Sequence, residues 1–211
     1  MSAKVYIHIL CFFLSAAPAF AVERSPQWWT MEAKVGFWMP TDKATKQFFD
    51  KCCNVVPMIN GGFLYQGRYG AEIGAGMMVQ SGTAVGSVGG AQSQDSFNLF
   101  LVPMETNAVM RFDFAENQIV VPYIKGGGDY VFFRENVEGN VTKGLKSGLH
   151  TIGGLQFLIE AIDTDASLET DYGINDFYIV VETRYGWVNS FGRNGLDLSG
   201  LTYSAGLLFE F

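Results

Sequence analysis

The sequence has few of the residues from which metal centres, disulfide frameworks and nucleic-acid surfaces are built. It has three cysteines and two histidines, and its 14 lysines and arginines are outnumbered by 21 aspartates and glutamates. We expect no binding to nucleic acid, because its phosphates require clusters of basic side chains and the chain has none. Beyond the first residues the chain also lacks a long unbroken apolar run, which excludes transmembrane helices.

Residues 1–21 are predicted to be a secretory signal peptide. Lys4 supplies the positive charge, residues 5–14 are largely apolar, and Ala19-Phe20-Ala21 offers a cleavage site of the small-x-small type. The apolar stretch is shorter than the roughly 20 residues that a spanning helix needs. Residues 22–211 are therefore expected to form the mature protein as one domain.

Apolar residues, 48% of the chain, recur at every second position. Met31, Val35 and Phe37, for example, alternate with Glu32 and Lys34. Such alternation puts the two sets on opposite faces of a strand. It recurs in eight segments, at residues 30–39, 59–66, 72–80, 102–114, 122–132, 149–160, 177–187 and 201–211. Most of these predicted strands have about 10 to 13 residues, enough for a tilted strand to cross a bilayer.

The connections between these segments alternate in length. Short turns are predicted at residues 66–68 and 115–117, and long polar loops at residues 40–57, 82–95, 135–147 and 189–200. Transmembrane barrels have this asymmetry, with short periplasmic turns and long outer loops. Residues 161–175 depart from it, because a long segment stands where a short turn is expected; its acid-rich start could open a helical turn.

Three features distinguish a membrane barrel from a soluble barrel of the lipocalin kind. The polar face is heavily charged and carries glycines at positions 36, 62, 74, 76, 186 and 206, as a narrow barrel interior requires. Aromatic residues lie near the strand ends of the apolar face, where membrane barrels have interfacial girdles. The chain also ends on an alternating strand, at Phe209-Glu210-Phe211.

With residues 121–130 and 148–159, these features resemble the small bacterial outer-membrane barrels of the OmpA/OmpW-like type. The resemblance implies an all-β fold, an eight-stranded antiparallel up-and-down transmembrane β-barrel in the bacterial outer membrane. It also implies recognition by the barrel-assembly machinery through the C-terminal Phe211.

The polar face is predicted to point into the lumen and to form a charge network that is either structural or pore-lining. Its members are Glu32, Lys34, Glu72, Glu105, Arg111, Asp113, Lys125, Asp129, His150, Glu160, Glu182, Arg184 and Glu210. In the structural interpretation the charges pair and fill the barrel, because buried charges persist only when they are paired. In the pore interpretation the acidic excess favours a narrow cation-preferring path. Leu64, Met78, Val109 and Trp38 are the only candidates for an apolar patch inside, which disfavours a conduit for apolar molecules.

No catalytic, cofactor or metal site is predicted. A lipid-modifying barrel enzyme would need a histidine and a serine two residues apart on a strand, but Ile152 occupies that position after His150, and Ser147 lies in the loop on its other side. The adjacent Cys52 and Cys53 cannot form a simple internal staple; they could stay free, pair between chains or form the rare adjacent bridge. Two cysteines and one mature histidine make a poor zinc site.

These observations predict a structural or binding barrel that acts through its outer loops. A small cation-preferring pore or conduit is the alternative, and a lipid-modifying enzyme is a weaker one. The expected partners are outer-membrane lipids and lipopolysaccharide, and the protein is expected to be a monomer.

Overall fold

The computed structural model describes residues 28–48, 54–85, 92–115, 118–137, 140–159, 176–190 and 197–211. The predicted signal peptide, Cys52, Cys53, Glu160 and the 161–175 segment lie outside these residues. The described elements are β1 (Trp29–Pro40), α2 (Lys43–Phe48), β2 (Asn54–Tyr65), β3 (Tyr69–Gly76), β4 (Met78–Val85), β5 (Gln92–Arg111), β6 (Val120–Val137), β7 (Asn140–Leu158), β8 (Asp176–Trp187) and β9 (Gly200–Glu210).

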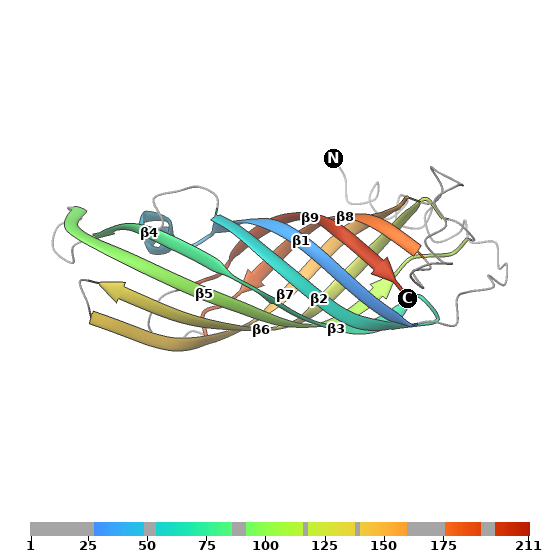
Figure 1. Cartoon of the computed structure of the whole chain (residues 1–211), viewed down its shortest axis with the longest axis horizontal. Helices are drawn as coiled ribbons and strands as arrows, with labels where there is room; N and C mark the ends of the chain where they lie inside the picture. Colours follow the sequence, from blue (N-terminus) through green and yellow to red (C-terminus); the bar gives the residue numbers. More distant parts are fainter. Residues whose placement is uncertain are drawn as a thin grey trace, which may run out of the picture.

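The strands form one closed antiparallel barrel (Figure 1). β1 pairs with β2 on one side and with β9 on the other, so the first and last strands close the sheet. β3 and β4 both pair with β5 and are two parts of one wall strand. They are separated at Met77, whose N–H donates to the Pro57 carbonyl at 3.2 Å. Eight wall strands result, which confirms the predicted fold.

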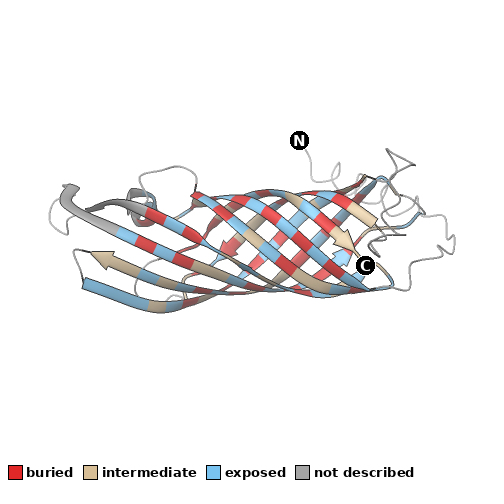
Figure 2. Cartoon of the chain, in the orientation of Figure 1, coloured by how far each residue is buried: buried red, intermediate tan, exposed pale blue. Residues whose placement is uncertain are grey.

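Buried and exposed residues alternate along the strands of the barrel wall (Figure 2). In β1, Glu32 and Lys34 are buried, whereas Met31, Val35 and Phe37 are exposed. The charged face therefore points inward and the apolar face outward, the reverse of a soluble barrel. This orientation confirms the predicted assignment of the two faces.

The strands on one side of the barrel are longer than predicted. β5, β6 and β7 have 20, 18 and 19 residues, and β6 pairs with β7 as far as Val137 and Asn140. Most of the 135–147 segment is thus a hairpin and not a loop, and β4 and β5 likewise extend into the predicted 82–95 loop. Figure 1 shows these strands projecting beyond the rest at the outer end, which we define as the end at which β1 and β8 end and β2 and β9 begin. Backbone pairing there does not depend on apolar residues, so hydropathy gave no sign of it.

A tight hairpin turn connects β2 to β3. It lies at the opposite end of the barrel, which we call the turn end. Gln66 and Gly67 have φ angles of 52° and 62°, and the Arg68 N–H donates to the Tyr65 carbonyl at 3.1 Å. Two successive residues with positive φ are typical of a type I′ hairpin turn. The predicted short turn at residues 66–68 is therefore confirmed.

One short helix, α2, follows β1 at the outer end. The Asp42 carboxylate accepts a hydrogen bond from the Thr45 N–H at 2.9 Å, which caps the first turn. The Thr45 hydroxyl donates to the Asp197 carbonyl at 2.7 Å, so α2 is attached to the connection before β9. Among the described residues, no helix has the length and apolar character needed to cross a membrane.

Candidate functional site: the barrel lumen

The lumen contains most of the ionisable residues that the alternation assigned to it. Those that are buried are Glu32, Lys34, Glu72, Glu105, Arg111, Lys125, Asp129, His150 and Glu182. Arg184 and Glu210 are partly buried, and so is Asp113, which lies beyond the end of β5. The inward positions of β1, β3 and β5 to β8 bring eight of the buried residues, all except Arg111, into one layer with Arg184. We call these nine residues the charged layer.

Lys34 is the central cation of the charged layer. Its Nζ lies 2.6 Å from Glu182, 3.0 Å from Glu32 and 3.6 Å from Glu105. These carboxylates come from three different strands, β8, β1 and β5. One ammonium group therefore connects opposite sides of the barrel across the lumen.

Lys125 is a second cation in the same layer. Its Nζ donates to Glu32 at 2.9 Å and to Glu72 at 2.8 Å. Glu32 thus lies between the two lysines. The Tyr123 hydroxyl donates to Glu182 at 2.8 Å, which gives that carboxylate a second donor beside Lys34. Buried charges are stabilised when they are paired and hydrogen-bonded in this way.

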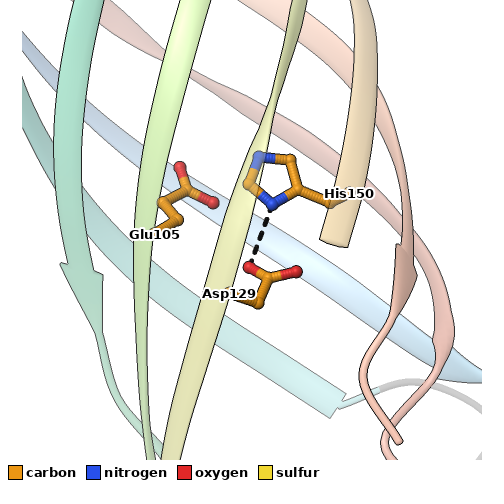
Figure 3. A group of neighbouring side chains, drawn as sticks. All are labelled: Glu105, Asp129 and His150. Carbon is orange, nitrogen blue, oxygen red and sulfur yellow. Dashed lines mark ion pairs between the residues drawn. The ribbon is translucent and has the colours of Figure 1, made fainter. Parts of the chain in front are cut away.

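A third group of side chains extends the layer towards β7. The Arg184 guanidinium lies 2.6 Å from Asp129 Oδ1, and His150 Nδ1 lies 3.1 Å from the same oxygen. The Asn107 amide donates to Glu105 Oε1 at 3.2 Å, and its own oxygen faces His150 Nε2. Figure 3 shows Glu105, Asp129 and His150 pointing towards one another from three neighbouring strands, β5, β6 and β7.

Arg111 and Glu210 form a separate ion pair towards the turn end. The Arg111 guanidinium also lies 5.0 Å from the centre of the Tyr178 ring, a cation–π distance. The predicted network is thus divided into the charged layer and this second pair. Arg68 Nε donates to the backbone carbonyl of Asp113 at 2.9 Å, which fixes the chain after β5.

Three members of the site are uncharged and were not predicted from the sequence. Asn60, Asn107 and Tyr123 each donate a hydrogen bond to a carboxylate of the charged layer. All three share the inward parity of the charged residues, and that parity is the signal by which they could have been found. Gly74 provides space beside them, because a Cβ there would lie 2.4 Å from Asn60 Oδ1 and 3.0 Å from Glu105 Cγ.

The expectation that only four residues could line an apolar lumen was wrong. Towards the outer end, one apolar cluster contains Trp38, Val56, Met78, Leu99, Leu101, Val131, Val188 and Leu198. Towards the turn end, a second contains Val121, Tyr123, Ile152, Leu158, Tyr178, Val180 and Leu208. These segments are apolar on both faces, so their inward members were not distinguished by alternation. The charged layer lies between two apolar layers.

A pocket occupies the outer half of the lumen. It contains about 690 Å³ of empty space, with the open solvent at its mouth included. Its walls are mainly apolar and include Trp38, Val56, Met78, Leu101, Val131 and Val188. The charged layer contributes Lys34, Glu105, Asp129, Glu182 and Arg184 to its lining. The pocket therefore joins an apolar wall to a charged floor.

Solved structures with this fold come from bacterial outer membranes. OprG, an outer membrane protein of Pseudomonas aeruginosa, has a TM-score of 0.58 at 11% identity, over 88% of this chain and 96% of that one. Neisserial surface protein A (NspA) has a TM-score of 0.56 at 12% identity, over 87% and 97%. The N-terminal β-barrel domain of Pseudomonas aeruginosa OprF has a TM-score of 0.52 at 11% identity, over 89% and 100%.

No protein-family model matches the chain, and no curated protein matches it in sequence. At identities this low, the likeness to the solved structures is one of fold.

Proposed function

We propose that the chain is an integral protein of the bacterial outer membrane with a closed lumen, and that it has a structural or binding role at its outer end. The charged layer is the observation that carries this proposal. Its buried ion pairs join strands on opposite sides of the barrel at the level where an ion would have to pass. No described feature of the lumen points to catalysis, and His150 faces Asp129 and Asn107 inside the barrel.

The outward face supports the membrane location. Large apolar side chains are exposed there, among them Ile73 at 70% and Ile59 at 58%. Exposed aromatic residues lie near both ends: Trp29, Phe63, Tyr65 and Tyr69 at the turn end, and Phe37, Tyr130, Trp187 and Tyr203 towards the outer end. This arrangement suits a hydrocarbon core between two interfaces. A closed sheet also leaves no edge unpaired within the lipid.

A pair of basic residues supports contact with lipopolysaccharide. Arg134 of β6 and Lys143 of β7 are direct cross-strand partners on the projecting hairpin, and both are exposed. Like charges directly opposite each other are destabilising, and an anion between them would remove that cost. Both residues have the outward parity of their strands, so they face the outer leaflet, where lipopolysaccharide presents phosphate groups.

A small cation-preferring pore is the second candidate, and the acidic excess of the charged layer supports it. Planar-bilayer recording of the purified, folded protein separates the two. We expect no channel events at neutral pH over a range of voltages, because the ion-paired layer spans the lumen. Reproducible cation-selective steps from the unmodified protein would overturn the closed-lumen proposal and favour the pore.

A further inference from the structure

The charged layer has a surplus of negative charge. Five carboxylates, Glu32, Glu72, Glu105, Asp129 and Glu182, face three permanent cations, Lys34, Lys125 and Arg184. With a neutral imidazole at His150 and all five carboxylates ionised, two negative charges have no counter-charge in this buried layer. Uncompensated buried charge is costly, so such a layer takes up a proton or another cation.

Hydrogen bonds around His150 indicate where a cation would bind. The Asn107 amide nitrogen donates to Glu105, so the Asn107 oxygen faces His150 Nε2 and accepts its proton. The neutral ring then has a lone pair on Nδ1, which is directed at the Asp129 carboxylate 3.1 Å away. A lone pair facing a carboxylate is repulsive unless a proton or a metal ion lies between the two groups.

Each of the three residues near this position has a buried ligand atom available. His150 Nδ1, Asp129 Oδ2 and Glu105 Oε2 each lack a hydrogen-bond partner, although their side chains are at most 2% exposed. One ligand atom from each residue lies within 4.8 Å of the others. Imidazole and carboxylate donors suit divalent transition metals such as zinc. The Asn107 contact fixes the ring tautomer and orientation, as outer-shell partners do at metal sites.

We propose that Glu105, Asp129 and His150 bind one divalent transition-metal ion at the floor of the lumen pocket. The ion's two charges balance the surplus of the charged layer. Glu105 and Asp129 both line the pocket, whose empty space has room for a further water ligand. Without the metal ion, Arg184 neutralises part of the charge of Asp129 by contacting its Oδ1 atom. Asp129 Oδ2 has no hydrogen-bond partner and can therefore bind the metal ion. The sequence-based expectation of no metal site rested on the two loop cysteines and the single mature histidine.

The first test is calorimetric titration of the folded, metal-free barrel in detergent with Zn²⁺. We expect one ion per chain, and at least about tenfold weaker binding for His150→Gln and for Asp129→Asn, which remove ligands. Arg184→Gln should bind about tenfold more tightly or better, because it removes a competing cation. Glu182→Gln is the matched control: it makes the same charge change as Asp129→Asn in the same pocket, away from the three ligand atoms.

Each result of this titration decides the proposal. Absence of Zn²⁺ binding by the unmodified barrel overturns it. Equal weakening by Asp129→Asn and Glu182→Gln also overturns it, because general attraction by the acidic pocket would then be sufficient. Binding that none of the variants changes places the ion elsewhere on the protein.

A second measurement requires no variant to fold. His150 is the only histidine of the described residues, so its ¹⁵N-labelled imidazole is a specific reporter in nuclear magnetic resonance spectra. Zn²⁺ should shift the Nδ1 resonance at constant pH. A ring that responds to pH but not to Zn²⁺ would show that a proton occupies the position, and would overturn the site. Metal binding and conductance are independent readouts, so either proposal can fail without the other.

Discussion

Lys34 Nζ lies 2.6 Å from Glu182 Oε1, although 148 residues separate them in the sequence. Their strands, β1 and β8, are not neighbours in the wall, because β9 lies between them. The ion pair therefore adds a connection that the sheet hydrogen bonds do not make. It is also the contact at which the structural role of the charged layer is most directly tested.

Lys34→Met should lower the free energy of unfolding by about 3–5 kcal/mol, the usual cost of removing one partner from a buried ion pair. Three carboxylates lose their shared cation, whereas Glu182→Gln removes only one charge and should cost less. Urea titration of the barrel in lipid vesicles, followed by gel mobility before and after heating, measures both. A loss below about 1 kcal/mol for Lys34→Met would argue against a structural role for the layer.

Ile73→Arg tests whether the outward face lies in a membrane. Ile73 is 70% exposed in the middle of β3, and an arginine at the bilayer midplane of such a barrel costs about 2–4 kcal/mol. Val141→Arg is the matched control, because Val141 is also exposed but lies at the outer end of β7, where the cost should fall to about 0–1 kcal/mol. Equal stabilities of the two variants in lipid vesicles would contradict the membrane placement.

Gly74→Ala is expected to destabilise the barrel by about 1–3 kcal/mol, because its Cβ would meet the Asn60 amide and displace it from Glu105. Gly153→Ala provides the comparison, since a Cβ at that position has nothing within 4 Å. It should be neutral or slightly stabilising. Unfolding curves for the two variants measure the difference, and similar losses would mean that crowding in the lumen is not its cause.

Arg134→Ala combined with Lys143→Ala should reduce the lipopolysaccharide that copurifies with the barrel, because each removes one cation from the outward pair. Lys43→Ala combined with Lys46→Ala is the control, with the same charge change at the exposed lysines of α2. Phosphate analysis of the purified samples gives the readout. An equal reduction in both double variants would indicate general electrostatic attraction and not a site on the hairpin.

Much of the architecture could be predicted because strand side chains alternate with a period of two. The charged residue Glu32, between the apolar Met31 and Ala33, identifies the polar face of its strand. Lys34 lies two residues further along and therefore belongs to the same face, which points into the lumen. The charged, glycine-rich polar face, the aromatic residues near the strand ends and the terminal aromatic indicated which face points inward. Each of these signals is local, so each can be read from a single sequence.

The contacts between side chains in the lumen could not be predicted, because they depend on which strands face each other across it. The distance from Lys34 to Glu182 depends on strand order and register, which parity does not contain. The inner position of Leu99 or Val131 was missed because the neighbouring outward residues are also apolar. The cluster of Glu105, Asp129 and His150 likewise could not be predicted without the registers of β5, β6 and β7. The sequence shows only that His150 is the one histidine after the predicted signal peptide.

The closure of the sheet by its first and last strands has a consequence for assembly. Until β8 and β9 have been added and joined to β1, Lys34 lacks its contact with Glu182 of β8, and Glu105 of β5 lacks its contacts with Lys34 and with Arg184 of β8. A partly assembled sheet would therefore expose these groups to lipid at a high cost in free energy. The charged layer thus stabilises the closed barrel relative to partly assembled intermediates.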